Sequence, residues 1–379
     1  MKPVYIVSWL FALAISFVSC DDWLDKTPKD RLYPDVYFKT EDELRLFTNQ
    51  FYNNLVPSAV DIYSESSDLI VKSDLMLEMS GQRIIPDEGN GWNFTALRDI
   101  NFYLQYSHNC TEVNARNRYD GVARFFRAYF YFEKVKRYGD IPWYDKALDS
   151  DDPELYKARD SREFVMQKML EDLDFAIANL PKTKNAYVLT RWTALALKSR
   201  VCLFEGTFRK YHGLEDCEKY LNACVSASET FMNESGYTLY KSGSTPYRDL
   251  FASINLQADE VIFGRDYEAS LSVLHNVQNY ENSTTMGRPG MNKKIVNSYL
   301  MADGSRFTDK AGYETMTFDQ ECQNRDPRLA QTIRTPGYTR IGSTKKEAPN
   351  LAYTMTGYHL MKYSMTANYD EYNKSCNDI

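Results

Sequence analysis

The sequence predicts a mainly α-helical protein with a helical first part and a loop-rich second part. Two observations support this class. Before residue 235, apolar side chains recur at steps of three and four in several segments, which is the period of one helix face. From about Gly236 onward, Gly, Pro, Thr, Asn and Tyr dominate and that period fades. With 379 residues, the chain is long enough for one large or two medium domains.

The N-terminal segment predicts export and a lipid anchor. Lys2 precedes an apolar run from Val4 to Val18, about 15 residues long and shorter than the roughly 20 that a membrane-spanning helix needs. We therefore interpret residues 1–19 as a cleaved signal peptide. Phe17-Val18-Ser19-Cys20 resembles a bacterial lipobox, so Cys20 is expected to carry acyl chains such as palmitate. The alternative is a secreted protein with an incidental cysteine.

Helices are expected in six segments of the first part. They are 41–55, 94–108, 121–138, 166–180, 194–204 and 220–231. Between the first two lies a polar loop broken by Gly and Pro. Ala128 to Phe132 and Ala227 to Phe231 both show the Ala-x-x-x-Phe spacing of a tetratricopeptide second helix. The sequence thus predicts irregular tetratricopeptide-like helical pairs, interrupted by a long insertion at 143–160.

The second part is expected to hold little regular structure. Val261-Ile262-Phe263 predicts a short buried strand, and Lys294 to Met301 predicts a brief helix. The remaining loops are long, and such loops usually carry function or are disordered. A loop-rich second lobe containing short strands is therefore expected.

Composition narrows the function. The net charge of −7, with acids and bases mixed, argues against a nucleic-acid partner and weakly against a polyanionic ligand. The seven cysteines lack zinc-site spacing, and Cys217 and Cys224 lie too far apart along one expected helix for a disulfide. The four histidines form no HExxH motif, and no nucleotide or serine-hydrolase motif is present. No enzyme activity, cofactor or metal is predicted. Two interpretations of Asp149, Asp151 and Asp152 stay open: a calcium site, or a solvated acidic loop.

Several short segments, in order, resemble one family. They are Cys20 to Asp25, Gly121 to Ala128, Tyr138 to Pro142, Asp172-Leu173 with Leu180-Pro181, Arg191 with Ala194 to Val201, Asp303-Gly304, and Arg325 to Leu329. Together they resemble the SusD/RagB family of surface lipoproteins of the Bacteroidetes. Val122 replaces an acidic residue that is usual in the family, so any ion pair made there is expected to be absent. Arg325 and Arg328 are expected to be structural, pairing with carboxylates or capping carbonyls.

The resemblance implies a fold, a role and a partner. The implied fold is a cradle of tetratricopeptide-like helices over 20–235 with a loop-rich lobe over 236–379. The implied role is binding of a glycan or another nutrient at the cell surface, on a lipid-anchored outer-membrane protein. The implied partner is a SusC-like TonB-dependent transporter. Family members usually continue further, so the chain is expected to lack terminal helices and to expose apolar positions in 194–231, such as Trp192, Leu195, Leu203 and Leu221.

A sugar site needs an aromatic face for the ring and polar side chains for the hydroxyls. The loop at 74–93 and the second part supply the candidates Asp74, Arg83, Trp92, Asn93, Tyr267 and Tyr280. For Trp92, packing in the core at a helix start is the alternative. Two other functions also stay open: a tetratricopeptide-type protein-binding scaffold and a surface glycan-degrading enzyme.

Overall fold

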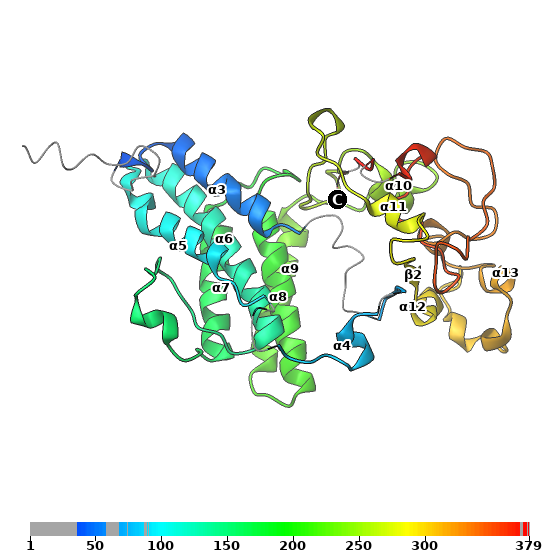
Figure 1. Cartoon of the computed structure of the whole chain (residues 1–379), viewed down its shortest axis with the longest axis horizontal. Coiled ribbons are helices and arrows are strands. Elements are labelled where there is room, and N and C mark those ends of the chain that lie inside the picture. The colour runs from blue at the N-terminus through cyan, green and yellow to red at the C-terminus, as the bar shows by residue number, and fades with distance from the viewer. Residues whose placement is uncertain are drawn as a thin grey trace, which may run out of the picture.

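The computed structural model describes residues 36–57, 68–73, 75–86, 89, 91–371, 374–376 and 378. A helical lobe and a loop-rich lobe lie side by side (Figure 1). The helical lobe contains α3 (Glu41–Leu55), α5 (Thr95–Tyr106), α6 (Val113–Tyr138), α7 (Arg162–Asn179), α8 (Arg191–Tyr211) and α9 (Cys217–Glu234). The expected signal peptide, Cys20 and Asp74 lie outside the described residues.

Local capping explains where several helices begin. Thr40 and Glu43 form a capping box at α3, in which Thr40 Oγ1 accepts from the Glu43 amide at 3.3 Å and Glu43 Oε2 accepts from the Thr40 amide at 3.1 Å. The predicted helix at 41–55 is therefore confirmed at both ends. By contrast, α6 begins at Val113, well before the expected Gly121, because its first turns are mostly polar and give little apolar periodicity. It ends at Gly139, whose φ of +71° favours glycine.

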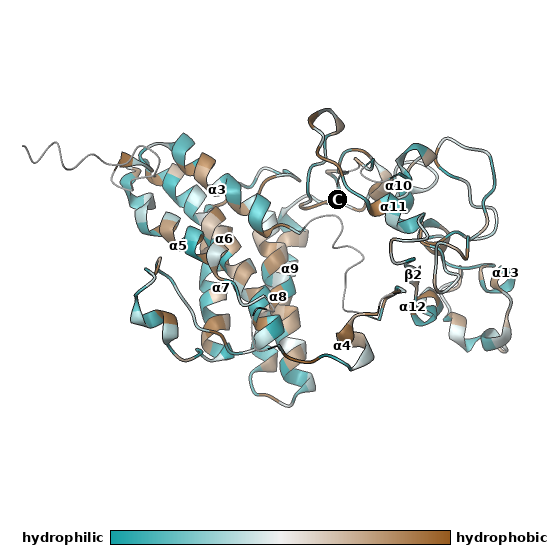
Figure 2. Cartoon of the chain, in the orientation of Figure 1, coloured by the Kyte–Doolittle hydropathy of each residue, from teal (hydrophilic) through white to brown (hydrophobic). Residues whose placement is uncertain are grey.

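The helices pack in pairs, α6 against α7 and α8 against α9, and α3 also packs against α6. Hydrophobic and hydrophilic residues alternate along these helices, so each can bury one face (Figure 2). Phe125, Phe126 and Phe132 are at most 5% exposed, as expected of core residues. The predicted mainly helical architecture with tetratricopeptide-like pairs is confirmed.

The loop lobe has its own small core. It contains the short helices α10 (Pro246–Ala252), α11 (Val277–Glu281), α12 (Lys293–Ser298) and α13 (Phe318–Glu321). Residues of α11, α12 and α13 contribute to or pack against a buried apolar cluster that includes Val277, Val296, Leu329, Ile333 and Leu360. The helix expected at 294–301 is confirmed as α12, although it ends at Ser298.

Arg325 ties several segments of this lobe together, whereas Arg328 makes a local contact. The Arg325 guanidinium donates to the carbonyls of Val296, Tyr299 and Glu321 at 2.6 to 2.8 Å. Arg328 forms an ion pair with Asp326 at 2.5 Å. The structural role expected for both arginines is thus confirmed.

The strand predicted at Val261 to Phe263 is wrong. Among the described residues, no other segment forms backbone hydrogen bonds of a β-ladder with this stretch, and its side chains pack against other residues. Ile262 contacts a small cluster formed by Trp192, Leu195 and Ala227. Trp192 and Leu195 are therefore each only 4% exposed, because other residues of this chain cover them. This corrects the expectation that these two side chains are left exposed. Leu203 is 51% exposed, as expected.

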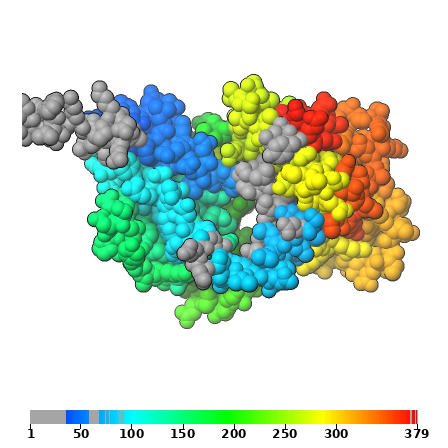
Figure 3. Space-filling view, viewed as in Figure 1, coloured from blue at the N-terminus to red at the C-terminus, as the bar shows by residue number. Residues whose placement is uncertain are grey.

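The segment before α5 joins the two lobes. Strands β1 (Ile70–Val71) and β2 (Gly290–Met291) pair antiparallel, with Ile70 opposite Met291. The chain then passes through α4 (Leu77–Ser80) and reaches the helical lobe again at α5. The space-filling view shows this segment running from one lobe to the other (Figure 3). Trp92 thus lies at the end of a crossing that begins in the loop lobe.

The cysteines and the helix lengths give two further findings. All six cysteines that the structure describes are free, so Cys217 and Cys224 form no disulfide, as predicted. Across the described ranges, none of the helices is both long and apolar enough to cross a bilayer.

Candidate functional site

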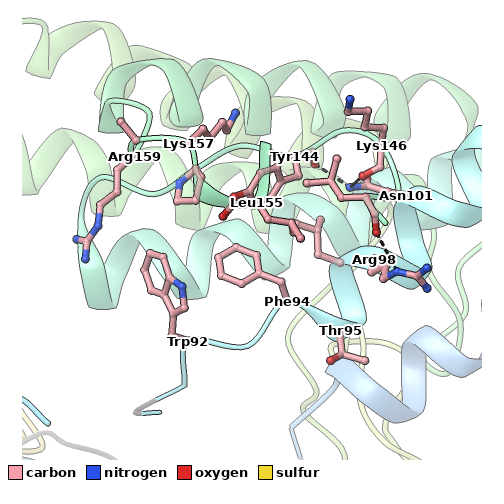
Figure 4. A pocket seen from close by; sticks show the side chains of 14 residues that line it. Trp92, Phe94, Thr95, Arg98, Asn101, Tyr144, Lys146, Leu155, Lys157 and Arg159 are labelled. Atoms are coloured by element: carbon pink, nitrogen blue, oxygen red, sulfur yellow. Dashed lines mark hydrogen bonds between the residues drawn. The ribbon is translucent and has the colours of Figure 1, made fainter. Parts of the chain in front are cut away.

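A hollow of about 540 Å³ opens where the start of α5 meets the insertion that follows α6. Aromatic and aliphatic side chains form much of its wall, among them Trp92, Phe94, Tyr144 and Leu155 (Figure 4). Concave sites lined by apolar side chains with a few polar groups are where small ligands commonly bind. We take this hollow as the candidate functional site.

A glycine turn places Trp92 at the rim. Gly91 has a φ of +83°, which a residue with a side chain rarely adopts, and the Trp92 amide donates to the Gly89 carbonyl at 3.0 Å. Lys134 Nζ, on α6, donates to the Gly91 carbonyl. The indole meets the rings of Tyr138 and Phe94 edge-on, at centroid distances of 4.9 and 5.3 Å. Trp92 is nevertheless 40% exposed, so it is supported from one side and open to solvent on another.

Tyr144 forms the opposite wall of the hollow. Its ring meets Phe94 edge-on at 5.8 Å, and its phenol donates to the Leu155 carbonyl at 3.3 Å. Lys157 Nζ lies 5.1 Å from the centre of the same ring. Burial, with the nearby Asp160 and Glu154 charges, raises the pKa of Tyr144, so the phenol stays protonated and donates.

Buried polar groups fix the floor of the hollow. Asn101, which is 1% exposed, donates from Nδ2 to the carbonyls of Tyr144 and Lys146 at 2.8 and 3.3 Å. Its Oδ1 accepts from Arg127 Nη1 at 3.2 Å. Trp143 stacks on Tyr131 of α6 with ring centres 4.3 Å apart. The insertion is therefore held to the helical core by side chains rather than by regular backbone pairing.

Four side chains that line the hollow are cationic. They are Arg98, Lys146, Lys157 and Arg159. Arg159 lies with its guanidinium carbon 5.0 Å from the centre of the Trp92 ring, a cation–π contact. Arg98 Nε donates to the Leu148 carbonyl at 3.3 Å. These donors stand at the edge of an aromatic surface.

The residues expected to bind sugar divide between the two lobes. Trp92 lines the hollow, and Asn93 is exposed beside it. Asn93 Oδ1 accepts from the Thr95 amide at 2.8 Å, so this side chain helps to begin α5. Arg83 is exposed on the crossing segment and does not line the hollow. Asp74 lies outside the described residues.

Tyr267 and Tyr280, the two candidates from the second part of the chain, both lie in the loop lobe. Tyr267 is only 6% exposed in the loop-lobe core, where its ring meets His275 at 4.6 Å. Tyr280 belongs to α11 and packs half-buried against the same core. Neither tyrosine lines the hollow. Their apolar rings help to build the core of the loop lobe.

Sequence reasoning missed most of the wall of the hollow. Tyr144, Lys157 and Arg159 all come from the insertion at 143–160, and Arg98 and Asn101 come from α5. The length of the insertion was the available signal, because long loops in compact domains often carry function. Its contacts with α5 were not readable from spacing.

The lining of the hollow combines apolar, amide and cationic side chains. Among the described residues that line it there is no carboxylate, whereas glycoside hydrolysis usually requires a pair of them. The part of the chain that the structure describes also contains no cluster of three His, Cys, Asp or Glu side chains placed to hold a metal. In the acidic loop considered for calcium, Asp152 Oδ1 caps the following turn and Asp152 Oδ2 lies 3.6 Å from Lys146.

Comparisons with known proteins identify similar sequences. A family model described as SusD family matches residues 250–379, and one described as "Starch-binding associating with outer membrane" matches residues 80–191. The SusD-like protein P2 of Formosa agariphila is 26% identical over 294 residues, covering 72% of this chain and 55% of that protein. The SusD-like protein P38 of the same organism is 25% identical, covering 54% and 43%. The chain spans about half the length of these curated relatives.

Solved structures show the same fold. A SusD-like protein from Bacteroides fragilis is 21% identical with a TM-score of 0.68, covering 93% of this chain and 74% of that one. A SusD-like carbohydrate binding protein from the same species is 16% identical with a TM-score of 0.69, covering 89% and 71%. A structure described as a complex with xylogluco-oligosaccharide is 16% identical with a TM-score of 0.61, covering 88% and 67%. On the family models, the relatives and the fold together, this chain belongs to the SusD/RagB family.

Proposed function

We propose that this protein binds an oligosaccharide in the hollow between α5 and the 143–160 insertion. The observation that carries the proposal is Trp92, an indole that is 40% exposed at the rim of the hollow and braced by Tyr138 and Phe94. A sugar ring presents C–H groups on its faces, which pack on an aromatic surface, and hydroxyls at its edges, which need donors and acceptors. The hollow offers both.

The rigidity of the site supports binding. Phe94 and Tyr144 pack against each other, and buried Asn101 holds the Tyr144 carbonyl, so the walls need little ordering when a ligand enters. A preformed site loses less conformational entropy on binding. Because sugar hydroxyls exchange bonds with water for bonds with protein, we expect modest affinity, with Kd in roughly the micromolar to millimolar range.

The wider role that we propose rests on the family. The chain is then a lipid-anchored protein of the outer membrane, facing outward, that passes its ligand to a SusC-like TonB-dependent transporter. One solved structure of similar fold is described as a SusD-like carbohydrate binding protein, and one matching family model is described as associating with the outer membrane. Anchoring through Cys20 and delivery to a transporter are part of the proposal.

Trp92→Ala tests the site. We expect it to reduce oligosaccharide binding at least tenfold in calorimetric titrations against a panel of glycans. Since Trp92 is partly exposed, the loss of stability should stay below the roughly 3–5 kcal/mol typical of a core tryptophan. Tyr156→Ala is the matched control, because Tyr156 is an 85% exposed aromatic residue on the same insertion that does not line the hollow. Unchanged binding by a folded Trp92→Ala variant would remove the hollow from consideration.

Two further measurements test the role. Cys20→Ala is expected to move the protein from the membrane fraction to the soluble fraction, because acyl chains supply the membrane affinity. Membrane association that persists in this variant contradicts the lipid anchor. Incubation of the purified protein with its glycan should release no reducing ends, and release that disappears when one carboxylate is mutated would instead establish an enzyme.

A further inference from the structure

The charge around the hollow is one-sided. Four of the side chains that line the hollow are charged at neutral pH, and all four are cations. The chain as a whole nevertheless carries a net charge of −7. Net charge describes the far field of a protein, whereas a ligand in a hollow responds mainly to groups within a Debye length of about 10 Å. The overall negative charge therefore does not decide which ligand this hollow prefers.

The two lysines are already neutralised by carboxylates outside the hollow. Lys146 lies 3.0 Å from Glu154 and 3.6 Å from Asp152. Lys157 lies 2.9 Å from Asp160. These pairs tie the insertion together and leave little charge to attract a ligand.

The two arginines are not neutralised in this way. Within the described parts of the chain, neither Arg98 nor Arg159 forms an ion pair. Arg98 Nε donates to the Leu148 carbonyl, and the charge of the neighbouring Asp99 interacts with Arg98 without the two forming an ion pair. The Arg159 guanidinium contacts the Trp92 ring. Most of their N–H donors remain available.

Their positions frame the aromatic wall. Arg159 lies beside Trp92 at one end of the hollow, and Arg98 lies at the other end, with Phe94 and Tyr144 between them (Figure 4). A guanidinium offers a planar set of donors that matches a carboxylate or a sulfate with two parallel hydrogen bonds. Such a pair is stronger than a bond to a neutral hydroxyl.

We infer that the hollow selects an acidic glycan, whose carboxylate or sulfate groups bind Arg159 and Arg98 while a sugar ring packs against the aromatic wall. This inference rests on the proposed function, since it names the substrate class of the same site. The shared chemistry is an anionic oxygen group on a sugar, which uronic acids and sulfate esters both supply.

Matched ligands separate charge from sugar shape. Binding is measured by calorimetry for oligogalacturonides and their methyl esters, and for a sulfated oligosaccharide and its desulfated form. The acidic member of at least one pair should bind at least tenfold more tightly than its neutral counterpart. That preference should weaken as salt rises from about 50 to 500 mM, because the ions screen exposed charges. The pair that shows the preference identifies the anionic group.

Matched variants locate the effect. The double variant Arg98→Gln/Arg159→Gln should lose at least tenfold in affinity for the acidic ligand and lose clearly less for the neutral one. Arg306→Gln is the control, since Arg306 is an exposed arginine lining a separate hollow of about 580 Å³ on the loop lobe. It should bind as the parent does. Melting temperatures of all variants confirm that they are folded.

The outcomes distinguish this inference from the proposed function. If acidic and neutral ligands bind equally and Trp92→Ala weakens both, the hollow binds glycans and the acidic preference is wrong. The preference is also wrong if the double variant keeps full affinity for the acidic ligand, or if Arg306→Gln loses it. If Trp92→Ala changes the affinity for neither the acidic nor the neutral ligand, the proposed function itself is wrong.

Discussion

Arg127 on α6 and Asp172 on α7 form a bidentate ion pair, with both N···O distances at 2.7 Å. The two side chains are 7% and 2% exposed. Burial alone would lower the pKa of Arg127, but the hydrogen bonds and the charge of Asp172 outweigh it and raise that pKa. Because Arg127 also donates to Asn101, this pair links the contact between two helices to the floor of the hollow.

Asp172→Asn should destabilise the protein by roughly 3–5 kcal/mol, because it leaves the Arg127 guanidinium buried without a counter-charge. Asp174→Asn, on the same helix, is the control, since Asp174 is 58% exposed in its pair with Lys198. Exposed pairs contribute about 0–1 kcal/mol. Urea unfolding of both variants measures the difference. If both variants lose the same free energy of unfolding, burial does not determine how much the Arg127–Asp172 pair contributes to stability.

Asn101→Ala should loosen the insertion without unfolding the protein. The change removes two hydrogen bonds to carbonyls at 144 and 146 and the acceptor for Arg127, and each buried group left unpaired costs about 1–3 kcal/mol. Hydrogen exchange should speed up in residues 142–159, and glycan affinity should fall. Gln105→Ala, at an exposed position of the same helix, should do neither. Unchanged exchange in Asn101→Ala would mean that Asn101 does not position the wall.

Gly206→Ala tests the close packing of α8 on α9. A Cβ at this position would lie 2.7 Å from Leu221 Cδ2 and 3.1 Å from the Leu221 amide nitrogen, so the helices would have to separate. Overpacking of this kind costs about 1–3 kcal/mol. Gly121→Ala, also in a helix, would meet Leu180 only at 3.4 Å and should be tolerated or slightly stabilising through helix propensity. Thermal melts that rank the two variants in the reverse order would contradict the packing.

His359 should make stability fall at acidic pH. The ring is fully buried: Nε2 donates to the Glu281 carbonyl at 2.7 Å, and Nδ1 accepts from the Asn350 amide at 3.2 Å, so one neutral tautomer satisfies both bonds. Burial, and secondarily the Arg334 charge, lower the pKa of His359 from 6.5 to about 4.

The sign of the pH effect follows from that shift. Between pH 6.5 and 4 the unfolded chain binds a proton at His359 that the folded chain does not. The stability contributed by the neutral, buried ring is therefore fully present above pH 6.5 and is lost as pH falls through about 4. The full effect is roughly 3 kcal/mol. His359→Asn should remove this part of the slope in urea unfolding against pH, and exposed His108→Asn should not. A parent-like slope in His359→Asn would assign the effect elsewhere.

The helical lobe could be read from sequence because its signals are local. The α3 boundaries follow from a capping box and an apolar stripe within fifteen residues, and the end of α6 follows from Gly139. The strand expected at Val261 to Phe263 failed for the opposite reason. A short apolar run becomes a strand only if another segment supplies backbone partners, and here the side chains of Ile262 and Phe263 pack on helical-lobe residues instead.

The sequence by itself determined the helical class and the family, and it predicted Trp92 as a binding residue, because caps, periodicity and ordered motifs depend on residues near one another in the chain. Only the tertiary structure decided which side chains surround Trp92 and that Tyr267 is buried elsewhere. The physical reason is that the wall joins residues 92–101 to residues 142–159 through hydrogen bonds such as Asn101 to the Tyr144 carbonyl. Bonds of that kind leave no periodic pattern, since any loop carbonyl can accept them once α6 and α7 have brought the segments together.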